Sequence, residues 1–296
     1  MLEIALVTYP SLPDLDVDDR LLLEPLIGLG CRVTAASWDD PHVDWDRFDV
    51  SVIRSTWDYT DNRDAFVTWA RSVPRLLNHA GVVDWNTDKR YLRDLAASGL
   101  PVIPTVWISD AASVDLPNSG EHVVKPSVGA ASLNAARHDL GDPKSRERAA
   151  SHAQRLLASG HTVMVQPFAH AIEEAGETGV ILIDGKLSHA MRKGSMLAPE
   201  TLEHVEELYK KETIEARVPS TAEVDLAYAA VAQAPDGDGP PLYARVDMVP
   251  DADGRPMIME LELTEPSLFM VTAPATAQRF AEAIATRARR MAASRK

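Results

Sequence analysis

Short apolar runs and amphipathic stretches alternate over the first 86 residues. Apolar runs at 3–9, 32–37 and 49–55 predict β-strands, and the last has the pattern of a strand buried on both faces. Helical patterns occur at 16–30 and 62–77. Because strand–helix–strand alternation forms parallel sheets, a small parallel sheet is predicted here. Ligands of such sheets bind where the strands end.

The pattern changes after residue 86. Between Thr87 and Pro167, helices are predicted at 88–99 and 142–160, and strands at 101–108, 121–132 and 161–168, the second of these running into a loop of small residues. From Ala169 onward the pattern is antiparallel, with β-hairpins predicted at 179–193 and 241–263. The first hairpin turns at Asp184–Gly185, a strong hairpin signal.

Three more helices are predicted in the last hundred residues, at 199–211, 220–233 and 274–294. The final helix carries Arg287, Arg289 and Arg290 in its last turns. Positive charges suit a helix C-terminus in water. We therefore expect these arginines to be solvated, with no binding role.

Carboxylates alternate with apolar residues in the second predicted hairpin. Glu260 and Glu262 share one face of a strand, and Arg245 and Asp247 share a face of the preceding strand. If the two faces coincide, three carboxylates meet and require a cation such as Mg²⁺, and Arg245 can neutralise phosphate oxygens. A solvated hairpin face explains the alternation equally well, because loop length leaves the register undetermined.

A lysine followed by small residues suggests an anion site. Lys125 ends a strand-like run, and Ser127, Gly129 and Ser132 follow in a loop whose backbone N–H groups could approach a phosphate. The loop is not a Walker A motif, and by itself a plain strand-to-turn transition is favoured. Similarly, Arg192 and Lys193 taken alone suggest an exposed basic strand end.

The segment 53–59 leaves the third strand at a predicted pocket mouth. Asp58 could hold a substrate ammonium and Arg54 a carboxylate. Helix capping by Ser55, Thr56 or Asp58, with Trp57 packed below, explains the same residues equally well.

Composition excludes several classes of function. The chain has 296 residues and a formal net charge of −14, which disfavours nucleic acid and anionic membranes as partners. A single cysteine, Cys31, rules out an intrachain disulfide and a multi-cysteine zinc site. The N-terminus lacks a basic leader, and no apolar run approaches the ~20 residues of a membrane helix. We therefore expect a cytoplasmic protein that meets neither membrane nor nucleic acid.

The order of these motifs is more specific than any one of them. The series "NTDKRYL", "VVKPSVGAAS", "VMVQPF", "GETGVILIDGKLSHAMRKG" and "YARVDMV…IMELELTEPS" resembles the ATP-grasp superfamily over nearly the whole chain. "QPFAHAIEEAGETGVILIDG" is similar to the matching stretch of bacterial glutathione synthetases. "RSTWDY" and "ELELTEPSLF" resemble a subgroup that includes O-ureidoserine cyclo-ligase, also called D-cycloserine synthetase.

The resemblance implies an α/β (α+β) ATP-grasp fold in three domains. Residues 1–86 would form a small parallel-sheet, Rossmann-like substrate domain. Residues 87–166 would form a central lid domain, and residues 167–296 a C-terminal antiparallel-sheet catalytic domain. A homodimer is left open.

The resemblance also assigns roles to residues. Lys89 and Lys125 would contact ATP phosphates, beneath a lid loop at 127–132 that contains Ser127, Gly129 and Ser132. Adenine would lie beside Gln166, Pro167 and Phe168, and Glu177 would lie near the ribose. Arg192, Lys193 and Arg245 would stabilise the transferring phosphoryl group. Asp247, Glu260 and Glu262 would hold two Mg²⁺ ions, with Mn²⁺ as an alternative. Candidates for the substrate pocket are Tyr9, Arg54, Ser55, Thr56, Trp57 and Asp58.

The implied reaction is ATP- and Mg²⁺-dependent formation of a C–N bond through an acylphosphate. For the cyclo-ligase it converts a small amino acid, O-ureido-D-serine, to D-cycloserine, releasing ADP, phosphate, CO₂ and NH₃. An intermolecular carboxylate–amine ligase, a small-molecule kinase and a non-catalytic ATP-binding module are the alternatives. Gly179 stands where glutathione synthetases carry an arginine, which argues against that activity, and Glu262 stands where asparagine is frequent.

Overall fold

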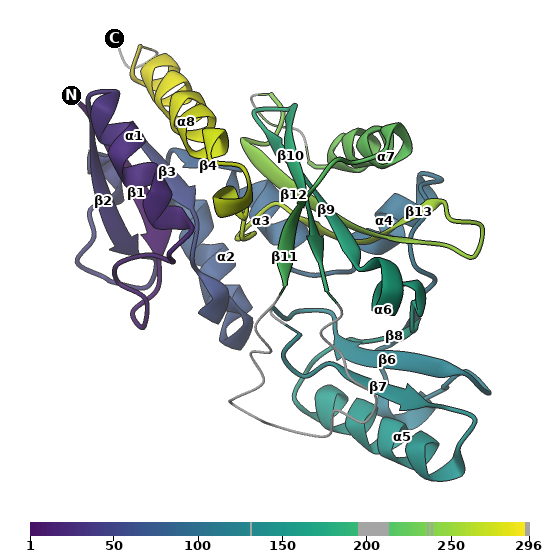
Figure 1. The fold of residues 1–296 in the computed structure, drawn as a ribbon. Helices are drawn as coiled ribbons and strands as arrows, with labels where there is room; N and C mark the ends of the chain where they lie inside the picture. The colour runs from purple at the N-terminus through teal and green to yellow at the C-terminus, as the bar shows by residue number, and fades with distance from the viewer. Residues whose placement is uncertain (131, 195–212, 236, 238, 294–296) are drawn as a thin grey trace.

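The computed structural model describes residues 1–130, 132–194, 213–235, 237 and 239–293. The helix predicted at 199–211 lies outside these residues. The strands form three separate sheets, which succeed one another along the chain (Figure 1). Within the described part of the chain, no helix is long and apolar enough to cross a membrane.

The first sheet is parallel, as predicted, with strand order β2-β1-β3-β4. Its strands are β1 (Leu2–Thr8), β2 (Cys31–Ser37), β3 (Val50–Ile53) and β4 (Leu76–Leu77). The accompanying helices are η1 (Asp19–Leu22), α1 (Leu23–Gly28), η2 (Trp45–Arg47), η3 (Trp57–Asp61) and α2 (Arg63–Ser72). The helix predicted at 62–77 ends earlier than expected, at Ser72. Val73 is extended ahead of Pro74, which disfavours helix in the residue before it, and β4 follows.

The second sheet is antiparallel, with order β5-β8-β6-β7. It contains β5 (Val106–Ile108), β6 (Glu121–Pro126), β7 (Ala136–Asp139) and β8 (Val163–Pro167), and α5 (Pro143–Ala158) packs on it through Ala149, Ala153 and Leu156. Strand β7 was not predicted. The short helices α3 (Ala80–Asn86) and α4 (Tyr91–Ala97) precede this sheet, η4 (Ala111–Ser113) follows β5, and α6 (Ala171–Ala175) follows β8.

Two histidines are buried between β7 and α5. His152 donates from Nε2 to the Asn134 carbonyl at 3.1 Å, so its Nδ1 can accept from Nε2 of His138 at 3.4 Å. Burial, with His152 beside it, lowers the pKa of His138 to about 4. The folded state therefore keeps His138 neutral where the unfolded chain, titrating near pH ~6.5, takes up a proton.

Stability is expected to fall as the pH drops from about 6.5 toward 4, because only the unfolded state gains this proton. Replacing His138 by glutamine should flatten that part of the dependence, measured as the melting temperature across the pH series. His42, which is exposed, provides the control change to glutamine. A parallel pH dependence in wild type and His138→Gln would contradict the assignment.

The third sheet is antiparallel, with order β11-β10-β9-β12-β13. It contains β9 (Glu177–Ile183), β10 (Lys186–Lys193), β11 (Ile214–Arg217), β12 (Tyr243–Pro250) and β13 (Pro256–Glu262). Both predicted hairpins are confirmed, and the Asp184–Gly185 turn has positive φ at both residues. Helix α7 (Thr221–Val231), which begins with a Ser220–Glu223 capping box, packs on β9, β12 and β13.

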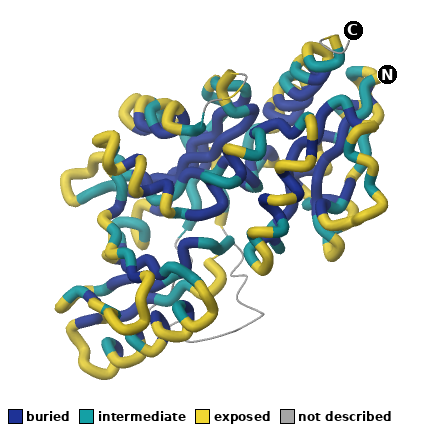
Figure 2. The backbone as a smooth tube through the Cα atoms, turned by 180° about the vertical axis from the view of Figure 1, so that it is seen from behind, coloured by how far each residue is buried: buried dark blue, intermediate teal, exposed yellow. Residues whose placement is uncertain are grey.

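The last helix, α8 (Ala275–Ala293), joins the first and third sheets after η5 (Met270–Thr272). Its Phe280 and Ile284 share one core with Ile4 of β1 and Ile181 of β9, and Figure 2 shows buried backbone along the central strands of both sheets. Arg287 is not solvated as expected. It donates to Asp184 Oδ1 from Nε at 2.9 Å and so ties α8 to the β9–β10 turn.

Side chains cover the outer edge of β13. The Leu261 N–H donates to the Tyr91 hydroxyl at 2.9 Å, and the Leu261 carbonyl accepts from Asn86 Nδ2 at 2.7 Å. Asn86 Oδ1 also accepts from the Leu263 N–H at 2.6 Å, and Asn78 Nδ2 donates to the Leu263 carbonyl at 2.7 Å. These side chains satisfy backbone groups that an edge strand would leave unpaired. The strand that carries Glu260 and Glu262 is thereby held in place.

Candidate active site

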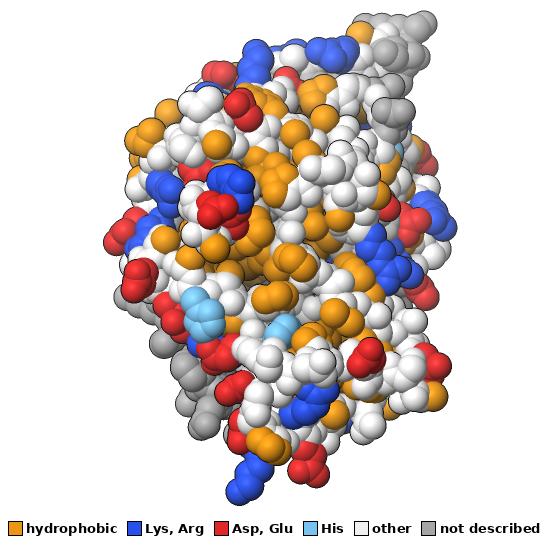
Figure 3. All heavy atoms as spheres, turned by 90° about the vertical axis from the view of Figure 1, so that its right-hand side faces the viewer, with side chains coloured by type: hydrophobic (Ala, Val, Ile, Leu, Met, Phe, Trp, Pro, Cys, Tyr) orange, Lys and Arg blue, Asp and Glu red, His pale blue; other side chains and the backbone are white. Residues whose placement is uncertain are grey.

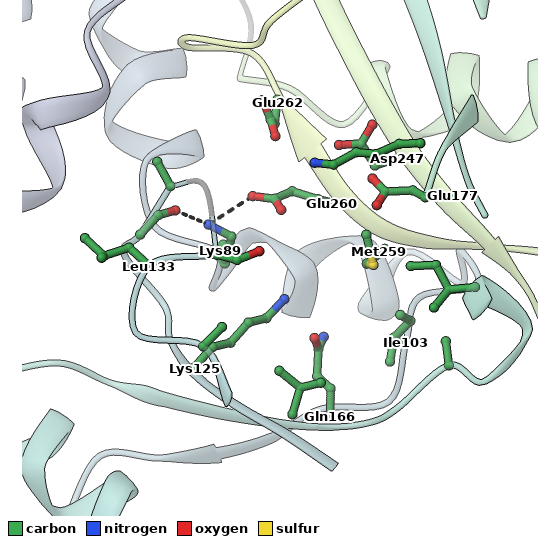
Figure 4. A pocket seen from close by; sticks show the side chains of 18 of the residues that line it. Lys89, Ile103, Lys125, Leu133, Gln166, Glu177, Asp247, Met259, Glu260 and Glu262 are labelled. Carbon is green, nitrogen blue, oxygen red and sulfur yellow. Dashed lines mark hydrogen bonds and ion pairs between the residues drawn. The ribbon is translucent and has the colours of Figure 1, made fainter. Parts of the chain in front are cut away.

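A cavity of about 480 Å³ is lined by residues of the second and third sheets and by Trp57. One part of its lining is apolar, with Ile103, Val123, Phe168, Ile172 and Met259. The other part is charged, with Lys89, Lys125, Glu177, Lys193, Arg245, Asp247, Glu260, Glu262 and Glu265 (Figure 4). On the face of the molecule in Figure 3, by contrast, acidic and basic side chains are scattered, and apolar ones gather toward its middle.

The register of the second hairpin brings the predicted carboxylates together. Arg245 pairs with Glu262 and Asp247 with Glu260, and the register then shifts so that Met248 pairs with Ile258. The bulge leaves Met259 as an extra residue, and Met259 and Glu260, although adjacent, both line the cavity. The interpretation as a solvated hairpin face is therefore wrong, since these carboxylates line a cavity with basic partners.

Arg245 holds two of the three predicted metal ligands. Its Nε lies 2.8 Å from Asp247 Oδ1, its Nη2 bonds Asp247 Oδ2 at 2.9 Å and also pairs with Glu262, and its Nη1 donates to the Ser267 carbonyl at 2.8 Å. The third ligand, Glu260, pairs with Lys89 Nζ at 2.9 Å. Within the described residues, no three acidic, histidine or cysteine side chains are already arranged as a metal site. The predicted ligands thus share one cavity but are held by basic side chains.

The lining of the site holds five acidic and four basic side chains. Burial raises the pKa of Glu262 to about 8, against the opposing effect of Arg245. Burial and the neighbouring Asp247 raise the pKa of Glu177 to about 8 as well. Burial also disfavours the Glu260 carboxylate, but Lys89 and Lys125 outweigh it and lower its pKa. Several carboxyl groups gathered in one cavity fit a hard divalent ion such as Mg²⁺.

The predicted phosphate-binding lysines both line this cavity. Lys89 bridges two elements, because its Nζ donates to the Gly129 carbonyl at 2.5 Å as well as to Glu260. Burial lowers the pKa of Lys125, which lies below Lys89 in Figure 4. Gly129 and Ser132 line the cavity, whereas Ser127 is buried beside Asp88 and its carbonyl accepts from the Lys89 N–H at 2.8 Å. Ser127 therefore holds the backbone of Lys89 in place and is not part of the cavity lining.

The predicted adenine hinge lies at the apolar part. Gln166, Pro167 and Phe168 all line the cavity, and the Gln166 amide donates to Thr105 Oγ1 at 2.9 Å. Glu177, which the resemblance placed at the ribose, has its carboxylate beside Asp247 and Glu260, and its place at the ribose stays a prediction. Glu177 thus belongs to the charged part of the cavity.

Arg192 does not reach the cavity. Its Nε and Nη2 donate to the carbonyls of Ala175 and Glu174 at 2.5 and 2.7 Å, at the end of α6. Successive side chains on a strand point to opposite faces, so Lys193, the next residue of β10, lines the cavity. The predicted role of Arg192 at the phosphoryl group is therefore corrected, while that of Lys193 remains a proposal.

Among the substrate candidates of the N-terminal sheet, only Trp57 lines the cavity. Tyr9 packs at the edge of an aromatic core, and Asp58 accepts from Trp38 Nε1 at 3.0 Å beside a separate, shallow hollow. Thr56 is buried and precedes η3 without a side-chain cap, and the Ser55 hydroxyl donates to Asp19 at 2.6 Å. These side chains shape the segment that carries Trp57.

Arg54 is buried in the protein rather than facing a substrate. Its Nε pairs with Asp19 at 2.8 Å, its Nη2 donates to the Pro266 carbonyl at 2.6 Å, and its guanidinium stacks 4.8 Å from the Tyr243 ring centre. The predicted role of Arg54 in binding a substrate carboxylate was wrong. Its guanidinium lies beneath α8, where it is already paired with Asp19. Arg54 joins the first sheet to the segment after β13.

Replacing Arg54 by methionine is expected to lower the free energy of unfolding by about 3–5 kcal/mol, because Asp19 is left buried without its partner. Urea denaturation measures the loss. The control is Arg32→Met, whose side chain is 63% exposed beside Glu3 and should contribute about 0–1 kcal/mol. Similar losses in the two variants would contradict the structural role of Arg54.

Several residues that line the cavity were not among the sequence candidates. Glu265 was left without a role because it follows the strand, where alternation no longer predicts its direction. Ile103 and Met259 line the apolar part, and their own sequence context contains no pattern that distinguishes them from core residues.

Comparison with known proteins agrees with this geometry. Residues 4–78 match the family model described as D-cycloserine synthetase DcsG, N-terminal domain. The cycloserine biosynthesis protein DcsG of Streptomyces lavendulae is 38% identical over 298 residues, covering 96% of this chain and 98% of the relative. The crystal structure of D-cycloserine synthetase DcsG superposes with a TM-score of 0.86 at 37% identity, covering 97% of this chain and 99% of that one.

The fold extends to a more distant enzyme. The ATP-grasp ligase PsnB, complexed with its minimal precursor, superposes with a TM-score of 0.64 at 18% identity, covering 96% of this chain and 99% of that one. Similarity of this kind shows a common fold, and it confirms the ATP-grasp architecture predicted from the order of motifs. Together with the full-length similarity in sequence, it establishes that this chain belongs to the D-cycloserine synthetase family of ATP-grasp ligases.

Proposed function

We propose that the protein is an ATP- and Mg²⁺-dependent cyclo-ligase that converts O-ureido-D-serine to D-cycloserine. The observation that supports this most is the cavity in which Lys89, Lys125 and Arg245 face three clustered carboxylates, next to an apolar part large enough for a base. The similarity to a protein named D-cycloserine synthetase, over nearly its full length, supports the choice of substrate.

The proposed chemistry has two stages. The substrate carboxylate takes the γ-phosphoryl group of ATP, and a nitrogen of the same molecule then attacks the acyl carbon and displaces phosphate. The ureido carbonyl leaves with one water as CO₂ and NH₃, so one ATP and one water yield D-cycloserine, ADP, phosphate, CO₂ and NH₃. Holding both reacting groups of one molecule in a closed cavity favours ring closure over hydrolysis.

The residues of the cavity divide this work. Ile103, Phe168 and Met259 would bind adenine through apolar contact, and Lys125 with Lys193 would attract phosphate oxygens. Asp247, Glu260 and Glu262 would hold Mg²⁺, which supplies charge stabilisation for phosphoryl transfer. Arg245, already fixed by Ser267 and Asp247, would face the transferring group without further ordering.

The test is mass spectrometry of the products formed from O-ureido-D-serine, ATP and Mg²⁺. D-Cycloserine and ADP in equal amounts are expected, and the L-enantiomer serves as the comparison substrate. ADP without cycloserine would reject the cyclo-ligase. A dipeptide or amide formed in the presence of a second amino acid would identify an intermolecular ligase, and a stable phosphorylated product would identify a kinase.

A further inference from the structure

Glu265 lines the cavity beyond the end of β13, three residues after Glu262. Its carboxylate neighbours the hydroxyl of Tyr59, a buried residue of η3, and this hydroxyl lowers the pKa of the carboxyl against the effect of burial. The neighbouring residue of η3 on the cavity side, Trp57, donates from Nε1 to the Glu265 carbonyl at 3.2 Å. Both the side chain and the backbone of Glu265 are therefore held by one short helix of the first sheet.

The segment that carries Glu265 is fixed at three successive carbonyls. Trp57 binds the carbonyl of Glu265, Arg54 Nη2 binds that of Pro266 at 2.6 Å, and Arg245 Nη1 binds that of Ser267 at 2.8 Å. Two of the donors follow β3 in the first sheet, and the third lies on β12 of the third sheet. A side chain on such a segment is preorganised, so it loses little freedom when a ligand binds.

The Glu265 carboxylate lacks a full positive partner. Among the described residues, no lysine or arginine forms an ion pair with it, and the Nζ of nearby Lys89 is bonded to Glu260 and to Gly129. Burial raises the pKa of Glu265 to about 7, although the Tyr59 hydroxyl and the charge of Lys89 oppose this. An ionised carboxylate only accepts hydrogen bonds, so its complement in this cavity is a cationic N–H donor.

We propose that Glu265 binds the α-ammonium group of the amino acid substrate and that Tyr59 positions the Glu265 carboxylate for it. This inference rests on the proposed function, because it requires an α-amino acid in the cavity. In such a substrate a single carbon separates the ammonium from the carboxylate. Arg245, which would face the activated carboxylate, is bonded to Ser267, two residues from Glu265. Arg245 and Glu265 both line the cavity, so one bound amino acid can meet a cationic and an anionic side chain.

The ureido group of the substrate is a weaker candidate for the same carboxylate. It is neutral, so its hydrogen bond to the Glu265 carboxylate would lack the charge assistance that an ammonium provides. It is also separated from the reacting carboxylate by a longer chain of atoms. Glu265 therefore selects substrates by their amino group.

The experiment compares O-ureido-D-serine with its analogue in which hydrogen replaces the α-amino group. Calorimetry in the presence of a non-hydrolysable ATP analogue and Mg²⁺ measures the affinity of each compound for wild type, Glu265→Gln and Tyr59→Phe. Wild type should bind the amino compound roughly 10- to 100-fold more tightly, as expected for one charge-assisted contact. Glu265→Gln should remove that preference, and Tyr59→Phe should reduce it. The affinity for the ATP analogue should stay unchanged in both.

Equal affinities of wild type for the two compounds would overturn the assignment, as would a preference that survives in Glu265→Gln. Glu147→Gln, an exposed glutamate of α5, is the matched control and should behave as wild type. If Glu265→Gln is unfolded and does not bind the ATP analogue, Tyr59→Phe provides the test. A reduced preference for the amino compound supports the assignment, and an unchanged preference contradicts it. Because these are binding measurements, absence of cycloserine formation by wild type rejects the proposed function separately.

Discussion

Exchanging Glu260 and Glu262 together for glutamine is expected to abolish Mg²⁺-dependent ADP release, lowering turnover by roughly 10²–10⁴-fold. Glutamine preserves the size of each side chain but supplies a neutral, weaker oxygen ligand to a hard cation. Both side chains line the charged part of the cavity and already have Lys89 and Arg245 as partners. The measurement is the rate of ADP formation with O-ureido-D-serine as Mg²⁺ is titrated.

Two observations separate lost metal binding from lost structure. The circular dichroism spectrum of the double variant should match that of wild type, because both positions are half-buried at the cavity wall. Each single variant should retain some activity at raised Mg²⁺ concentration, since the remaining carboxylates can still bind an ion. Unchanged turnover in the double variant would refute the assignment of Glu260 and Glu262 as metal ligands.

Replacing Arg245 by lysine should lower kcat/KM for O-ureido-D-serine by about 10²–10³-fold, the usual effect of losing a preorganised donor at a developing charge. The charge is conserved, but the three N–H groups of an ammonium cannot reproduce the planar fork that bonds both oxygens of Asp247, Glu262 and the Ser267 carbonyl. Steady-state kinetics should show most of the loss in kcat, because the interaction is proposed to act in the transition state.

The matched control lies on the same hairpin. Arg255 bonds Asp251 in the β12–β13 turn and is 72% exposed, so Arg255→Lys should leave kcat/KM unchanged. An equal loss in Arg245→Lys and Arg255→Lys would mean that the hairpin as a whole, and not the guanidinium in the cavity, limits activity. A loss confined to KM would instead assign Arg245 to substrate binding alone.

Local patterns predicted the strands but not their partners. The two hairpins of the third sheet follow from period-two alternation and from turn residues such as Asp184–Gly185. The register between Arg245 and Glu262 depends on the bulge at Met259, which has no distinct sequence signal. The short strands β7 and β11 were missed because they have too few residues for alternation to be visible.

The sequence identified the charged residues of the site better than their surroundings. Lys89, Lys125 and Asp247 were placed by the order of motifs in a family, since they lie on separate elements that no local pattern connects. The roles of Arg54 and Arg192 were predicted wrongly because both depend on tertiary packing. Packing buries Arg54 beneath α8, and it decides that the side chain of Arg192 points away from the cavity. Glu265 escaped prediction for the same reason.

The hydrogen bonds to the carbonyls of residues 265–267 affect how substitutions in this protein combine. Their donors are Trp57 and Arg54 from the first sheet and Arg245 from the third. The segment that carries Glu265 is therefore held in place by residues of both sheets. Replacing Trp57 and Arg54 together would leave the carbonyls of Glu265 and Pro266 without these two donors. In this chain, substitutions in the first sheet and in the segment after β13 are therefore expected to be coupled, because the two share these hydrogen bonds.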